Sequence, residues 1–123
     1  MPKFCPDCGG QTVLRVVDSD NRPRNICKSC DKIHYQNPKI IVGSLPIINN
    51  SVLLCKRAIE PSIGMWTIPS GFMELNESLE DGARREALEE ANLTFNIVKL
   101  YGTYSIPRIG QVLFVYLAKI LNN

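Results

Sequence analysis

Three glutamates in one short segment, Glu86, Glu89 and Glu90, have a spacing that could bind a metal ion. A capping-box pattern begins at Ser78 and predicts a helix from there to Ala91. At about 100° per residue, Glu86 and Glu90 lie about 40° apart around this helix, and Glu89 lies about 60° to one side. Like charges at this spacing repel each other, and a hard cation such as Mg²⁺ or Mn²⁺ takes oxygen ligands. The segment therefore predicts a divalent-metal site along one edge of a helix.

A second set of candidate ligands consists of four cysteines near the N-terminus. They form two C-x2-C pairs, Cys5 with Cys8 and Cys27 with Cys30. Two such pairs are typical of a closed tetrahedral zinc site, in which four thiolates bind the ion. Disulfides are the alternative, and the absence of an export signal disfavours them. His34 is expected to be packed or hydrogen-bonded rather than a ligand, and Cys55 to be an inert buried thiol.

Several β-rich segments are expected to position these residues. Residues 12–17 and 24–26 predict a hairpin between the two cysteine pairs, and a segment this small needs its metal to fold. The helix has an apolar arc with three alanines, which allows close packing on a sheet. The remaining predicted elements are a core strand at 40–45, a hairpin at 46–54 turning at Asn49-Asn50, a loop at 61–64, and two central strands of a mixed sheet at 94–106 and 111–120.

The segment that contains the glutamates resembles the signature of the Nudix hydrolases, G-x5-E-x7-R-E-U-x-E-E-x-G-U, where U is apolar. The matching residues are Gly71, Glu77, Arg85, Glu86, Ala87, Glu89, Glu90 and Leu93. Asn92 stands where the signature has its second glycine, and asparagine is the next residue best able to end a helix in a left-handed conformation. The resemblance, which extends through the cysteine-rich start, implies an α+β fold: a zinc ribbon at 1–35 and a Nudix α/β/α sandwich at 36–123.

The resemblance also implies roles for individual residues. Glu86 and Glu90 would hold the principal Mg²⁺ or Mn²⁺, and Glu89 and the Gly71 carbonyl would complete that site or bridge a second ion. Arg85 would pair with Glu77 or Glu89 and keep the carboxylates in register. Catalytic residues would be Glu77, Arg85, Glu86, Glu89 and Glu90.

Relatives that carry the ribbon are similar to pyrophosphatases of ADP-ribose, FAD and NADH, which implies a nucleotide-derived substrate. Candidate substrate contacts are Arg57, Trp66, Glu74, Tyr104 and Arg108. Ordinary roles stay open for them: Trp66 is expected in the core more than in a ligand stack, and Arg57, Tyr104 and Arg108 could be surface or packing residues. The alternative function is a catalytically weak or inactive nucleotide- or RNA-binding module, and a purely structural ribbon is also open.

Charge and composition limit the partners. The 123-residue chain has a net charge of +2, but residues 74–90 carry seven acids against two arginines. That acidic segment in a basic chain suits a cation site that receives an anionic substrate, and it does not suit duplex-DNA binding. No apolar run is long enough for a bilayer, so a cytoplasmic enzyme is expected.

The end of the sequence leads to one further expectation. No acid follows Glu90, and the strand and helix that cover the second face of the sheet in the resembling family have no counterpart before Asn123. Either the chain is a fragment or early-terminated version with weak or no activity, or a second copy covers the exposed apolar face. An uncovered sheet face is an association site or an aggregation liability, and we expect a homodimer.

Overall fold

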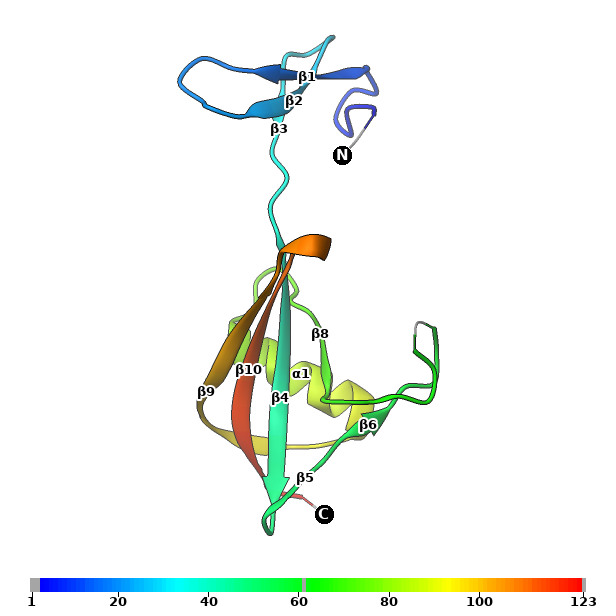
Figure 1. Cartoon of the computed structure of the whole chain (residues 1–123), viewed down its shortest axis with the longest axis vertical. Helices are drawn as coiled ribbons and strands as arrows, with labels where there is room; N and C mark the ends of the chain where they lie inside the picture. Colours follow the sequence, from blue (N-terminus) through cyan, green and yellow to red (C-terminus); the bar gives the residue numbers. More distant parts are fainter. Residues whose placement is uncertain (1–2, 61, 123) are drawn as a thin grey trace. The chain divides into compact units, whose positions relative to one another are not determined.

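The computed structural model describes residues 3–60 and 62–122, which form two compact units (Figure 1). The first unit extends to Asn37 and the second begins at Pro38. The predicted loop at 61–64 is described only in part, because Pro61 lies outside the described residues. No helix in the described part of the chain is long and apolar enough to cross a lipid bilayer.

The N-terminal unit is a small antiparallel sheet of order β1-β2-β3. Its strands are β1 (Thr12–Val16), β2 (Pro23–Cys27) and β3 (Ile33–His34). The predicted hairpin is confirmed to within about a residue at each end. The strand β3 was not predicted, because two residues are too few to show a period. Its few buried side chains, Cys5, Ile26 and Cys27, make a very small core.

The second unit is built on a mixed sheet of order β5-β4-β10-β9, with β8 also paired to β4. Its strands are β4 (Lys39–Ile48), β5 (Ser51–Val52), β8 (Ser70–Phe72), β9 (Phe95–Ile106) and β10 (Gln111–Ile120). The strand β10 runs parallel to β4 and antiparallel to β9, which confirms the mixed sheet. The prediction that both long strands are central is wrong for β9, which within residues 3–60 and 62–122 pairs with β10 alone.

Two hairpins follow β4 in the chain. Asn49 and Asn50, with φ of 48° and 63°, make the tight turn from β4 to β5, as predicted. Two successive left-handed residues are typical of a type I′ hairpin turn. A second, smaller hairpin pairs β6 (Cys55–Lys56) with β7 (Trp66–Thr67).

The helix α1 (Leu79–Ala91) confirms the predicted helix. The Ser78 hydroxyl accepts a hydrogen bond from the Asp81 N–H at 3.0 Å and caps the N-terminus. Asn92 adopts the left-handed conformation predicted for it, with φ of 51°, and its N–H donates to the carbonyls of Ala87 and Leu88. Asparagine therefore terminates the helix as a glycine would.

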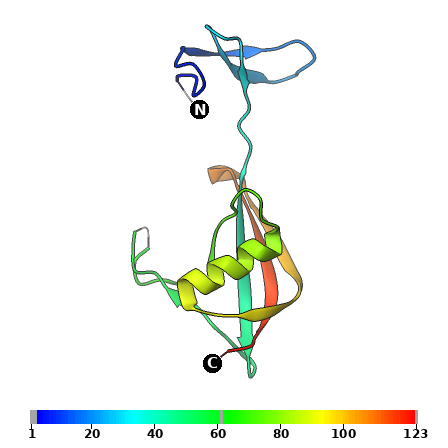
Figure 2. The ribbon, with the colours of Figure 1, turned by 180° about the vertical axis from the view of Figure 1, so that it is seen from behind.

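The helix α1 packs on one face of the sheet (Figure 2), and small residues make this contact close. Ala83 and Ala87 are fully buried, and a methyl group on Gly82 would lie 2.8 Å from Val42 of β4. The core beneath the helix consists of Ala87, Leu93, Phe95, Ala118 and Ile120. This packing fixes the helix against β4 and β8 and so determines where its acidic edge lies.

Candidate active site

Glu86 and Gly71 form the tightest contact of the site. Glu86 is buried, with its side chain only 11 % exposed, and its carboxylate lies directly over the α-carbon of Gly71. A β-carbon at Gly71 would lie 2.3 Å from Glu86 Oε1 and 2.5 Å from Oε2, which is closer than real β-carbons approach any atom. The missing side chain of Gly71 therefore leaves the space that the Glu86 carboxylate fills.

Glu90 lies one helical turn after Glu86 and joins the same site. Its Oε2 accepts a hydrogen bond from the Ser70 N–H at 3.2 Å, which connects α1 to β8. Burial raises the pKa of Glu90, the Ser70 N–H and the charge of Arg57 lower it, and the nearby Glu86 carboxylate raises it further. Two partly buried carboxylates thus face each other at close range, which is unfavourable without a cation.

Arg85 supplies the positive charge among these acids. Its Nε and Nη2 donate to the two Glu77 oxygens at 3.0 and 2.9 Å, a bidentate pair. Its Nη1 donates to Glu86 Oε1 at 2.8 Å and to Glu89 Oε2 at 3.3 Å. Arg85 was expected to pair with Glu77 or Glu89, and it pairs with both. The hydrogen bonds to Glu77 and Glu86 raise the pKa of Arg85, and the bond to Glu77 has the largest effect. The Phe72 carbonyl, which the sequence did not single out, accepts from Nη2 at 3.0 Å.

Glu77 connects this network to the loop before the helix. Besides its pair with Arg85, its Oε1 accepts the Glu74 N–H at 2.7 Å. These contacts, with Arg85 the larger, lower the pKa of Glu77 to about 2. Glu74, a candidate substrate contact, thus contributes its backbone N–H to this network, and the residue is exposed.

The residues fit a hard cation, with one difference from the expected ligand set. Glu86 offers its carboxylate oxygens in the space that a β-carbon at Gly71 would fill, and the Glu90 carboxylate lies next to that of Glu86. Glu89 is 59 % exposed and is held by Arg85. Within residues 3–60 and 62–122, the four cysteines are the only group of three or more potential ligands that lie mutually close, so the three glutamates do not converge as a set.

A cavity of about 330 Å³ opens next to Glu90. It is lined by Cys55, Lys56, Arg57, Ala58, Ile59, Thr67, Ile68, Ser70 and Glu90. Arg57, a candidate substrate contact, lies in this lining close enough to Glu90 to lower its pKa. Lys56, which the sequence offered as either a surface charge or a phosphate contact, also lies in the lining. Thr67 is an addition that the sequence did not single out, because the pairing of the short strands β6 and β7 brings it opposite Cys55. Cys55 is half-buried rather than part of the core, and burial raises the pKa of its thiol.

The preferred interpretation of Trp66, a core residue, is wrong. Its side chain is 63 % exposed, because β7 is a two-residue strand at the surface. Lys56 lies across from it in the β6–β7 pair, with Nζ 5.9 Å from the centre of the indole ring. An exposed indole beside the cavity is available for stacking.

Tyr104 and Arg108 lie on other elements. Tyr104 is half-exposed on β9, and Arg108 lies in the short 3-10 helix η1 (Pro107–Ile109) that follows it. Among the described residues, neither forms a hydrogen bond or ion pair with the glutamates of the site. The structure therefore does not bring these two candidates together with Glu86 and Glu90.

The four cysteines of the first unit meet as predicted. The Sγ atoms of Cys5, Cys8, Cys27 and Cys30 all lie within 4.8 Å of one another. The N–H groups of Cys30 and Ser29 donate to Cys27 Sγ and lower the pKa of that thiol to about 6, which suits a thiolate ligand. His34 is hydrogen-bonded, as expected, with Nε2 at 3.2 Å from Cys5 Sγ.

Two family models match consecutive parts of the chain. Residues 3–36 match the Nudix N-terminal family, a zinc ribbon, and residues 37–121 match the NUDIX domain. The NUDIX match covers more than half of the chain, so the chain belongs to the Nudix hydrolase family, a family of enzymes.

Individual relatives agree with this assignment. A crystal structure of a NUDIX hydrolase from Nitrosomonas europaea is 55% identical, with a TM-score of 0.94, and the match covers 99% of this chain and 69% of that one. The ADP-ribose pyrophosphatase of Methanocaldococcus jannaschii is 36% identical over 110 residues, covering 87% of this chain and 65% of the relative. The NAD-capped RNA hydrolase NudC of Vibrio atlanticus is 29% identical, covering 94% of this chain and only 41% of the relative. The chain thus spans about two fifths of the NudC proteins that it matches.

Proposed function

We propose that this chain is a metal-dependent hydrolase that cleaves the pyrophosphate bond of a nucleoside diphosphate linked to another group, as in ADP-ribose, NADH or FAD. The observation that carries the proposal is the buried Glu86 carboxylate over Gly71, with Glu90 beside it and an open cavity next to Glu90. The activities for which the two relatives are named support the same class of substrate.

Glu86, Glu90 and the Gly71 carbonyl would hold Mg²⁺ or Mn²⁺, with Glu89 able to join if it leaves Arg85. When bound, such an ion neutralises phosphate charge and makes water a better nucleophile. Arg85 keeps Glu77 and Glu86 in fixed positions through its fork of hydrogen bonds. Ser70 holds Glu90 at the mouth of the cavity.

The cavity beside Glu90 is the proposed substrate pocket. Arg57 and Lys56 supply positive charge on its wall, where a diphosphate needs it. The exposed ring of Trp66, next to Lys56, is placed to stack on a base or a flavin. Phosphate contact by Arg57 and stacking by Trp66 are both part of the proposal.

For the first unit we propose a structural Zn²⁺ on the four cysteines. Four sulfurs within 4.8 Å, with backbone N–H groups donating to Cys27 Sγ, support a closed thiolate site. The ribbon has few buried apolar side chains, so its fold depends on the ion.

A substrate screen tests the proposed activity. The chain is incubated with ADP-ribose, NADH and FAD in the presence of Mg²⁺ or Mn²⁺, and AMP is measured. The expected result is AMP release that requires the metal and falls on the order of a hundredfold or more in Glu90→Gln. Asp81→Asn is the matched control, because it removes an acid on the same helix whose one ion pair within the described part of the chain is with the exposed Arg84. Tight binding without turnover would instead favour the nucleotide-binding module.

We also keep the homodimer and the cytoplasmic location as proposals. Exposed apolar side chains on the edge strand β9, such as Val98 at 59 % and Leu100 at 45 %, support self-association. A monomer in analytical ultracentrifugation at micromolar concentration would exclude the dimer.

A further inference from the structure

Three side chains form a row across the ribbon sheet of the first unit. Arg15 of β1 pairs with Arg24 of β2, and directly opposite residues on neighbouring strands share a face. The β2–β3 pairing puts Asn25 opposite His34, so one further step places Arg24 opposite Tyr35. The Arg24 guanidinium carbon accordingly lies 5.3 Å from the centre of the Tyr35 ring. The row is therefore Arg15, Arg24, Tyr35.

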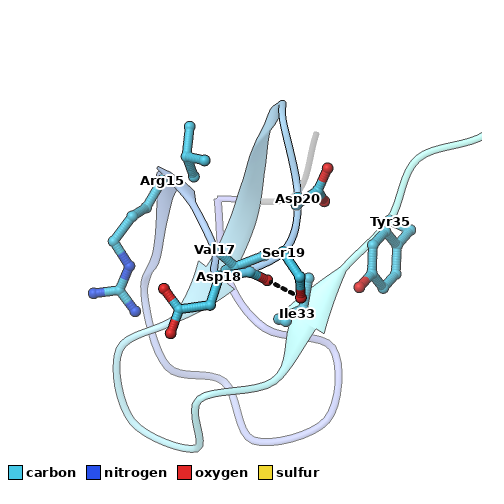
Figure 3. Close-up of a pocket in the computed structure, with 8 residues that line it drawn as sticks. Arg15, Val17, Asp18, Ser19, Asp20, Ile33 and Tyr35 are labelled. Carbon is cyan, nitrogen blue, oxygen red and sulfur yellow. Dashed lines mark hydrogen bonds between the residues drawn. The ribbon is translucent and has the colours of Figure 1, made fainter.

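A cavity of about 750 Å³ lies at this row (Figure 3). It is lined by Arg15, Val16, Val17, Asp18, Ser19, Asp20, Ile33 and Tyr35, all within the first unit. In Figure 3, Arg15 and Tyr35 stand on opposite sides, with the turn at Asp18 and Ser19 between them. Ser19 is in the left-handed region with φ of 61°, and a strained non-glycine residue is found more often at functional sites. The volume is in the range of small-molecule sites.

The side chains of the row differ in whether they already have a partner within the protein. Arg24 is held by Asp20, at 2.9 Å, and covers one face of Tyr35. Tyr35 is still 61 % exposed, so its other face is available for a flat ring. Within the described residues, no carboxylate lies within ion-pair distance of Arg15, which leaves its guanidinium for an anion. Tyr35 offers a ring for stacking and Arg15 a guanidinium for an anion, both in the lining of one cavity, and a nucleotide presents a flat base and an anionic phosphate.

We propose that this surface, which we call the Tyr35 site, binds one unpaired nucleobase and its neighbouring phosphate in a single-stranded RNA. The base stacks on Tyr35, Arg15 binds the phosphate, and the Asp18 carboxylate accepts from an amino group of the base. The first unit has six basic and four acidic side chains, so it lacks the positive stripe that duplex binding needs. Stacking on an aromatic ring tolerates any base, and Arg15 supplies the phosphate contact that single-strand binders combine with such stacking. The choice of RNA over a free nucleotide rests on the proposed function, in which RNA would be the group linked to the nucleoside diphosphate, as in the name of the NAD-capped RNA hydrolase relatives.

The test is a binding titration that needs no turnover. The full chain, with zinc loaded and no Mg²⁺ or Mn²⁺ added, is titrated against a fluorescein-labelled single-stranded RNA decamer by fluorescence anisotropy. We expect Tyr35→Ala to weaken binding about tenfold or more, and Tyr35→Phe to preserve it, because the phenyl ring still stacks. Tyr101→Ala removes an equally exposed tyrosine from the other unit and serves as the matched control. Arg15→Ala is expected to reduce the slope of log K against log salt by about 0.7.

Four results would overturn the proposal. The first is no RNA binding up to about 100 µM, and the second is equal RNA affinity of wild type and Tyr35→Ala. The third is a loss of RNA affinity in Tyr101→Ala as large as that in Tyr35→Ala. The fourth is competition by AMP as tight as that by the decamer, which would indicate that the site binds a free nucleotide instead. Zinc content is measured for each variant, so that unfolding of the ribbon is detected. Tyr35→Ala is expected to hydrolyse NADH as wild type does. If no variant hydrolyses any pyrophosphate, the proposed function fails, whereas the RNA titration still gives its own answer.

Discussion

Replacing Gly71 with alanine puts a methyl group where the Glu86 carboxylate lies. The new β-carbon would be 2.3 Å from Oε1, 2.4 Å from Cδ and 2.5 Å from Oε2. An ordinary contact begins at 3.4 Å, so the carboxylate must withdraw by about 1 Å. Glu86 is buried and bound to Arg85 at 2.8 Å, which leaves it little freedom to move without breaking that bond.

The consequence has two measurable parts. A displacement of about 1 Å in a positioned group can cost about a hundredfold in rate, so we expect kcat/KM of Gly71→Ala to fall by that order and Mn²⁺ affinity to fall with it. Loss of a hydrogen bond between charged groups costs about 1.5–3 kcal/mol, so the free energy of unfolding should fall by about that amount. The assays are AMP release, Mn²⁺ titration calorimetry and urea unfolding.

The matched control is Gly102→Ala on β9. Its added β-carbon would meet only the end of the Tyr104 side chain, at 3.1 Å, and that half-exposed chain can move. We expect its Mn²⁺ affinity to equal that of wild type. If Gly71→Ala also keeps the wild-type Mn²⁺ affinity and kcat/KM, the assignment of Gly71 and Glu86 to the metal site is refuted.

Three further predictions concern the supports of the site. The pKa of Glu77 is lowered to about 2 from its ordinary 4.5, so its charge stabilises the fold fully above pH 4.5 and this stabilisation is lost as the pH falls toward 2. In urea unfolding, the free energy of unfolding should therefore fall less over this pH range in Glu77→Gln than in wild type. An equal fall in both proteins would contradict the pair with Arg85. Asn92→Ala should destabilise the second unit by about 1 kcal/mol in urea unfolding, since alanine disfavours the left-handed conformation, whereas Asn92→Gly should not. Chelation of the ribbon metal should make residues 3–37 sensitive to protease while the second unit survives; a resistant ribbon would show that its fold does not need the ion.

Local patterns predicted the parts of the fold that depend on neighbours in the chain. The capping serine, the alanine arc and the left-handed Asn92 all follow from helix geometry, and α1 has the predicted extent. The Asn49-Asn50 turn was predictable for the same reason, since its two residues determine the turn type. The cysteine pairs also met as their spacing predicted.

Features that depend on tertiary contacts could not be predicted in the same way. The exposure of Trp66 is set by a two-residue strand that has no period to detect, and composition favoured the core. The edge position of β9 depends on which strand pairs with β4, and β10 takes that place. Glu89 lies on the same edge of the helix as Glu86, but Arg85 binds it in an exposed position. Helical spacing alone does not show that Arg85 competes with a metal ion for the Glu89 carboxylate.

The most direct test of the account is the location of a bound ion. Crystals of the chain soaked in MnCl₂ and measured at an energy where manganese scatters anomalously would show it as a peak in the difference map. We expect a peak that contacts carboxylate oxygens of Glu86 and Glu90 and the carbonyl oxygen of Gly71. A map without a peak there, with both carboxylates turned to solvent, would contradict it.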